Sequence, residues 1–255
     1  MRASIVVLAR RALRTAARRP QFLAPLVLFP TLFLALNVGG LGHTTTLPGF
    51  PKVDGFLDFQ LAAGITQSLL LGGVSAGIGV ALDIEGGFFD RLVASPAPRA
   101  AIVLGRVLAA GIIAAFQVSY FLVLGAVFGV DVKGGVLGVL TVLAIGILAG
   151  TGFGAIGVLI ALRARNASTV QGIFPLVFVV LFVSSAFFPA DLLSSPANAV
   201  AAYNPLSYIA EGMRHPIAFS NDVVALLEGL IAAAAVTIFA VALSLQALRG
   251  RLRQA

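Results

Sequence analysis

Six long stretches without a charged side chain decide what this chain can fold into. They cover 20–51, 59–82, 107–130, 134–162, 166–190 and 229–248. A helix needs about 20 apolar residues to cross a hydrocarbon core of about 30 Å. Because lipid offers no partner to an open backbone amide, we expect each stretch to be a transmembrane helix. The sequence predicts one all-α membrane domain over 1–255, with six transmembrane helices.

The composition excludes several classes of protein. Only 11% of the residues are charged, whereas a soluble domain carries about 25%. A soluble enzyme, a disordered tail and a secreted disulfide scaffold therefore fit poorly. A net charge of +7 would suggest nucleic acid in a soluble protein, but here most basic residues flank apolar stretches. The chain has no cysteine, which excludes thiol catalysis and cysteine metal sites.

The basic residues are distributed unevenly between the two sides of a six-span protein. One side holds both termini and fourteen arginines: six before the first span, three in 83–106, two in 163–165, and Arg249, Arg251 and Arg253. The other side holds Lys52, Lys133 and Arg214. Basic residues favour the cytoplasmic side, so we expect both termini in the cytoplasm. A seventh span over the polar stretch 192–210 would remove this asymmetry.

The segment before the first span, 2–18, has the pattern of an amphipathic helix. Arginines fall on one arc at 100° per residue, and apolar residues from Ile5 to Ala16 fall on the opposite arc. Such a helix lies in the membrane interface, with its arginines near anionic headgroups. A simple basic anchor beside the membrane is the alternative.

The spans lack the residues that several mechanisms need. None contains an Asp, Glu, Lys or Arg side chain, which disfavours a proton- or sodium-coupled carrier. His43 and His215 lie in separate segments without a carboxylate pair or metal-ligand spacing, so we expect no catalytic residue and no metal site. Lys52 and Lys133 lie outside any P-loop motif, so this chain cannot hydrolyse ATP by that mechanism.

Small residues line two of the predicted spans. On the fourth span, glycines recur every fourth residue at Gly146, Gly150 and Gly154, and Gly157 follows one turn on. The second span has a similar face of small residues, formed by Ser68, Gly72 and Ala76 beside Gly73 and Gly77. Such faces let helices approach closely in lipid. Packing within the chain and contact with a second subunit both remain open. Pro175 lies midway along the fifth span and should kink it.

The loop 83–106 is the one sizeable loop on the cytoplasmic side. Gly86 and Gly87 break it, and a short amphipathic turn follows in which phenylalanines alternate with charges, up to a stop at Ser95-Pro96. Exposed phenylalanines among charges suit docking to another protein. The alternative is an interfacial loop whose phenylalanines dip into lipid.

This loop resembles the E-x-G-[TS]-[LF]-[ED]-R-L-[LV]-x-S-P-x-x-R…G-[RK] pattern of type-2 ABC exporter permeases. That family includes daunorubicin/doxorubicin-resistance permeases and O-antigen or teichoic-acid exporters. The matching positions are Glu85, Gly87, Asp90, Arg91, Leu92, Ser95, Pro96, Arg99, Gly105 and Arg106, and Phe88 replaces the usual small residue. A second match, Tyr203 to Tyr208 with Glu211 and Arg214, resembles the family's N-P-[LF]-[ST]-[YH]…E-x-x-R before the last span.

The resemblance implies a partnership. Two permease chains, identical or siblings, would pair with two ATPase chains in a bacterial plasma membrane, with ATP and Mg on the ATPase and no cofactor on this chain. The loop would form a coupling helix on the ATPase, through Glu85, Gly87, Phe88, Phe89, Asp90, Arg91, Leu92, Ser95 and Pro96. The segment 191–222 would form a short re-entrant or outer hairpin, in which Asn204, Pro205, Glu211 and Arg214 are structural.

The substrate expected from this resemblance is an amphipathic drug, natural product or lipid, because the spans offer aromatic and polar surface without fixed charge. We expect spans two and five to wall its path, with contacts from Gln67, Phe116, Tyr120, Gln171, Phe174 and Phe178. A polysaccharide exporter is the alternative within the family, although the chain has no Trp and three Tyr to stack on sugars. Outside the family, an autonomous carrier or channel and a membrane enzyme remain as alternatives.

Overall fold

The computed structural model describes residues 1–189 and 192–252, and within them it contains helices and no strands. Asp191 and Arg253 lie outside the described residues. The helices are α1 Arg2–Ala17, α2 Pro20–Leu41, η1 Gly42–Thr46, α3 Phe56–Glu85, α4 Phe88–Ala94, α5 Arg99–Val127, α6 Gly135–Ala164, α7 Ala167–Gly172, α8 Phe174–Phe182, α9 Ala197–Ala201, α10 Pro205–Arg214, η3 His215–Phe219 and α11 Val223–Leu252.

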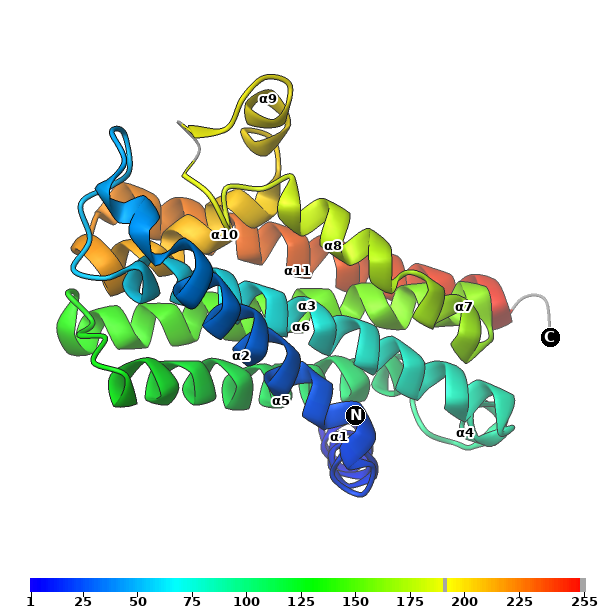
Figure 1. Cartoon of the computed structure of the whole chain (residues 1–255). Helices are drawn as coiled ribbons and strands as arrows, with labels where there is room; N and C mark the ends of the chain where they lie inside the picture. The colour runs from blue at the N-terminus through cyan, green and yellow to red at the C-terminus, as the bar shows by residue number, and fades with distance from the viewer. Residues whose placement is uncertain (190–191, 253–255) are drawn as a thin grey trace.

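Within the described residues, five segments are long and apolar enough to cross a membrane, and they correspond to five of the six predicted spans. They are Pro20–Thr46, Phe56–Glu85, Arg99–Val127, Gly135–Ala164 and Val223–Arg251. In Figure 1, α3, α5, α6 and α11 run side by side, and α2 crosses them obliquely. The all-helical membrane architecture is therefore confirmed for these five segments.

The fifth predicted span, 166–190, is not one straight helix. Two short helices, α7 and α8, meet at Ile173 and together form an apolar segment, Ala167–Phe182, that is shorter than a full span. Pro175 lies in the first turn of α8, where its missing N–H costs nothing. The proline therefore starts a new helix instead of kinking a continuous one.

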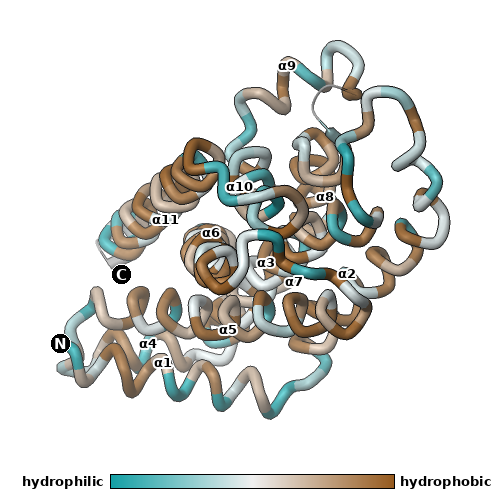
Figure 2. Tube along the Cα trace, turned by 90° about the vertical axis from the view of Figure 1, so that its left-hand side faces the viewer, coloured by the Kyte–Doolittle hydropathy of each residue, from teal (hydrophilic) through white to brown (hydrophobic). Residues whose placement is uncertain are grey.

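The amino-terminal helix is confirmed as α1, which lies across the bundle. In Figure 2, viewed along α6, α1 runs below α5, on one side of the bundle. Its buried alanines, Ala9 and Ala12, face α5, where Gly105 leaves room for Leu8. Arg10, Arg14 and Arg18 are exposed, as the amphipathic pattern predicts.

The glycine rows pack helices of this chain against one another. Gly146, Gly150 and Gly154 of α6 lie against Val118, Ala114 and Ala110 of α5. Gly157 of α6 meets Gly73 and Gly77 of α3 so closely that a Cβ on Gly77 would lie 2.7 Å from the Gly157 carbonyl oxygen. Packing within the chain is therefore confirmed, and it places α6 at the centre of the bundle (Figure 2).

Short helices precede the last span, in the segment predicted as a hairpin. Of these, α10 packs against α11 and α3, with Ile209, Ala210 and Met213 buried. Gly212 of α10 and Gly229 of α11 are in close contact, since a Cβ on Gly212 would lie 2.8 Å from the Gly229 Cα. This packing fixes α10 to the bundle.

Candidate functional site

The loop between α3 and α5 folds into the short helix α4. Gly87 begins it with φ at +65°, in the left-handed region that favours glycine. The Ser95 hydroxyl donates to the Leu92 carbonyl at 2.7 Å and ends the helix, just before Pro96. The two glycines and the Ser-Pro pair thus set the limits of α4.

The phenylalanines of α4 are less exposed than the sequence predicts. Phe89 is only 3% exposed and belongs to an apolar cluster with Val80 of α3 and Val103 of α5. Phe88 is half-buried, with the guanidinium carbon of Arg11 3.4 Å from its ring centroid. The exposed residues of α4 and its end are Asp90, Arg91, Ala94 and Pro96.

Two polar contacts join this loop to distant parts of the chain. A Glu85 carboxylate oxygen accepts a hydrogen bond from the Ala167 N–H at 2.8 Å, at the start of α7, where free N–H groups favour a negative charge. Asp90 accepts from Arg251 of α11 at 3.3 Å, and the Arg251 guanidinium lies 4.6 Å from the Phe89 ring centroid. The loop therefore contacts both α7 and α11.

An ion cluster connects α1, α3 and α5 beside α4. The Asp83 carboxylate accepts from Arg11 at 3.0 Å and also from Arg106, and the Asp83 and Arg106 side chains are 15% and 17% exposed. Burial lowers the pKa of Arg11, although a guanidinium stays charged at neutral pH. Because Arg11 also covers Phe88, the cluster joins three helices to α4.

Two grooves flank the broken helix α7–α8. One, of about 600 Å³, lies between α2, α3 and α7–α8, and the other, of about 220 Å³, lies between α3, α6 and α7–α8. The larger groove is lined by Gln21, Phe22, Pro25, Leu26, Phe29, Leu71, Val74, Ser75, Ile78, Ser168, Gln171, Gly172, Phe174 and Pro175. This lining has aromatic and neutral polar side chains and no charged one.

The structure brings three of the six predicted path residues together at the larger groove. Gln171 and Phe174 line it, and the Phe178 ring centroid lies 5.2 Å from that of Phe174. The Tyr120 hydroxyl instead lies 3.2 Å from the Thr31 hydroxyl of α2.

The two remaining path residues lie elsewhere. Phe116 is 63% exposed on α5 and lines neither groove. Gln67 is buried in α3, and its side-chain amide has no hydrogen-bond partner among the described residues. Residues of α3 and of α7–α8, which fall in predicted spans two and five, both line the larger groove. That a substrate passes between these spans stays a prediction.

The outer motif forms a hydrogen-bond network between α8, α10 and α3. Asn204 caps α10 by accepting from the Leu206 N–H at 3.0 Å, and it donates to the Val180 carbonyl of α8 at 2.9 Å. Pro205 occupies the first turn of α10. Ser185 donates to Glu211 at 3.1 Å.

Arg214 is the centre of this network, with 1% of its side chain exposed. Its guanidinium pairs with Glu211, donates to the carbonyls of Phe59 at 3.1 Å and Ser185 at 3.2 Å, and also donates to that of Ala186. It lies 3.9 Å from the Phe59 ring centroid. Each of these contacts lies within the chain.

Comparison with known proteins identifies the family. The family model described as ABC-2 type transporter matches residues 3–218. The chain belongs to this family. It is the transmembrane permease subunit of an ABC transporter and not the ATPase, and ABC-2 permeases normally partner with an ABC ATPase. A search of curated proteins found no match. Among the described residues, no group of three His, Asp or Glu side chains could hold a metal ion.

Two features of this ABC-2 permease were missed in the sequence. Phe22 and Phe29 of α2 line the larger groove, and their spacing of seven residues places them on one helix face. The ion pair of Asp83 with Arg106 joins the end of one span to the start of the next. Consecutive antiparallel spans bring the end of one helix close to the start of the next. The opposite charges at these two ends could therefore have predicted the ion pair.

Proposed function

We propose that this permease is half of an exporter, in which two permease chains, identical or siblings, work with two ABC ATPase chains. ATP and Mg bind on the ATPases, both termini of the permease lie in the cytoplasm, and the membrane is a bacterial plasma membrane. The fourteen-to-three split of basic residues supports this orientation.

The proposal rests on the packing of α4, which has one buried face and one exposed face. Its inner face is fixed by Phe89 in the bundle core, while Asp90, Arg91 and Ala94 face outward. A partner that binds the outer face would displace α4 as a rigid unit. Glu85 then transmits the displacement to α7, Arg11 to α1 and Arg251 to α11.

This arrangement couples ATP hydrolysis to the spans. Closure of the ATPase dimer displaces α4, and the pull on the start of α7 shifts the broken helix that borders both grooves. A short, proline-started helix is easier to tilt than a continuous span, since Ile173 already separates α7 from α8. The grooves on either side of it change width as it moves.

We expect Arg91→Glu to weaken the docking of the ATPase. Arg91 is exposed, and among the described residues its side chain donates one hydrogen bond, to the Gly87 carbonyl at 3.3 Å, so folding should be unaffected. Reversing a charge in an interface costs about a tenfold loss in affinity or more. The measurement is the amount of ATPase that copurifies with the permease. Lys52→Glu, at the opposite end of the bundle, is the control and should retain the ATPase; equal retention by both variants would refute this contact.

The proposed cargo is an amphipathic drug, natural product or lipid. The larger groove opens between α2 and α7–α8 and offers Phe22, Phe29 and Phe174 beside the amide of Gln171. Such a lining binds apolar rings and hydrogen-bonds a few polar groups. A polysaccharide is the in-family alternative, and it would need a more polar path than this one.

We expect Phe174→Ala to lower the affinity for such a cargo about threefold to tenfold, because a lost aromatic contact costs about 0.5–1.5 kcal/mol. The measurement is the drug concentration that half-maximally stimulates ATP hydrolysis by the permease–ATPase complex. Phe116→Ala is the matched control, since Phe116 lines neither groove, and its value should stay within about twofold of wild type. If Phe116→Ala lowered the affinity more than Phe174→Ala, the substrate path would lie at α5. Transport without any ATPase would favour an autonomous carrier.

A further inference from the structure

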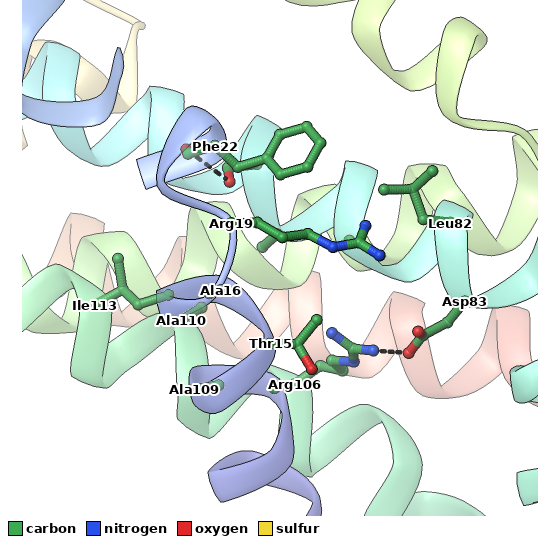
Figure 3. Close-up of a pocket in the computed structure, with 14 residues that line it drawn as sticks. Thr15, Ala16, Arg19, Phe22, Leu82, Asp83, Arg106, Ala109, Ala110 and Ile113 are labelled. Carbon is green, nitrogen blue, oxygen red and sulfur yellow. Dashed lines mark hydrogen bonds and ion pairs between the residues drawn. The ribbon is translucent and has the colours of Figure 1, made fainter. Parts of the chain in front are cut away.

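A separate cavity of about 110 Å³ lies where α1 turns into α2, and Figure 3 shows its lining. It is lined by residues of α1, α2, α3 and α5 and is partly open, on the side of α1 that faces the bundle. Its polar residues are Thr15, Arg19, Ser75, Asp83 and Arg106. We propose that this cavity binds the phosphate of an anionic phospholipid.

The charges around the cavity favour an anion. Arg19 and Arg106 line it and Arg11 lies beside Asp83, so three positive charges surround one carboxylate. Arg11 and Arg106 already share Asp83. The Arg19 guanidinium has no hydrogen-bond or ion-pair partner among the described residues, and in Figure 3 it extends toward Leu82 and Asp83. Arginine binds phosphate through several N–H groups at once.

Arg106 has donors to spare. Among the described residues, its guanidinium donates to Asp83 alone, yet a guanidinium carries five N–H donors. Its Nη1 atom lies toward Gly79, 3.7 Å from where a Cβ would stand on that glycine. Gly79 itself lines the cavity, so the missing side chain keeps space open in front of Arg106. A phosphate between Arg19 and Arg106 would give Arg19 a partner and Arg106 a second one beside Asp83.

The apolar end of the cavity distinguishes a lipid from a free phosphate. From Arg106, the lining continues two turns along α5 through Ala109 and Ala110 to Ile113, with Phe22 of α2 opposite. These residues lie deeper along the bundle than the arginines. The charged end therefore faces the headgroup level and the apolar end faces the acyl chains, which is the polarity of a phospholipid.

The proposal is tested on the purified full-length chain. The protein is incubated with equal amounts of phosphatidylglycerol and phosphatidylcholine of the same acyl chains, and the lipid retained is counted by native mass spectrometry. We expect one phosphatidylglycerol retained in preference to phosphatidylcholine. Arg19→Gln should lower this retention about fivefold, since a basic residue near anionic lipid contributes that factor. Gly79→Leu, which fills the cavity without removing charge, should lower it at least as much.

The control is Arg18→Gln, which removes the same charge from the neighbouring exposed arginine outside the cavity and should leave retention unchanged. If Arg18→Gln lowers retention as much as Arg19→Gln, the binding is diffuse electrostatics and the proposal fails. If excess inorganic phosphate displaces the lipid fully, the site is for free phosphate and the lipid assignment fails. Should Gly79→Leu not fold, judged by size exclusion, Arg19→Gln decides alone, because its side chain has no partner whose loss would unfold the chain.

Discussion

Replacing Arg214 with leucine is expected to lower the free energy of unfolding by about 3–5 kcal/mol, the cost of removing one partner from a buried ion pair. The loss arises because three carbonyls, of Phe59, Ser185 and Ala186, and the Glu211 carboxylate all accept hydrogen bonds from this one guanidinium. An apolar side chain would take this donor from the buried carbonyls of Ser185 and Ala186 and would leave Glu211 with the Ser185 hydroxyl in place of an ion pair. For a chain of this size, the melting temperature should fall by about 10 °C.

The measurement is the temperature at which the detergent-purified protein loses its monodisperse size-exclusion peak. Arg214→Lys keeps the charge but not the planar fork of donors, so an intermediate loss is expected. Arg163→Leu removes an exposed arginine and should change stability by about 0.5 kcal/mol or less. An Arg214→Leu protein as stable as Arg163→Leu would show that the hydrogen-bond network around Arg214 does not stabilise the fold.

Gly157→Ala is expected to cost about 3 kcal/mol, although it adds a single methyl group to a helix. A Cβ at this position would overlap the carbonyl oxygen of Gly73 and lie 2.9 Å from the Gly77 nitrogen. Both neighbours are backbone atoms that no rotamer change can move, so α3 and α6 must separate. Since Gly73 and Gly157 also line the smaller groove, its width changes with them.

The matched control is Gly39→Ala in α2, where no atom lies within 4 Å of the added Cβ. Alanine there should be neutral or stabilise the helix by about 0.5–1 kcal/mol. The same size-exclusion melting experiment compares the two variants. Equal melting temperatures would mean that α3 and α6 are not in the contact described.

The sequence predicted the features that depend on local pattern. Charge-free stretches located five long helices, and the arginine arc located α1, since both signals lie within one segment. The end of α8 was not predictable in this way, because no charged residue interrupts the sequence between Phe182 and Pro189. Hydropathy alone cannot tell a helix from an apolar turn.

The interior of the candidate site depended on contacts between distant residues. Phe89 is buried because α4 folds back onto Val80 and Val103, and no pattern within the loop says which face does so. The bonds from Glu85 to Ala167 and from Arg251 to Asp90 join residues 82 and 161 positions apart. Family motifs located the loop, and tertiary packing decided which of its residues stay exposed.

The central claim is that the outward face of α4 contacts an ABC ATPase, and crosslinking tests it most directly. The chain has no native cysteine, so a single Ala94→Cys substitution labels one exposed position without disturbing the Asp90–Arg251 pair. A crosslinker is applied to native membranes, and the product is identified by mass spectrometry. We predict a product that contains a P-loop ATPase from Ala94→Cys and none from Lys52→Cys at the opposite end. A folded Ala94→Cys protein that captures no ATPase would contradict the account.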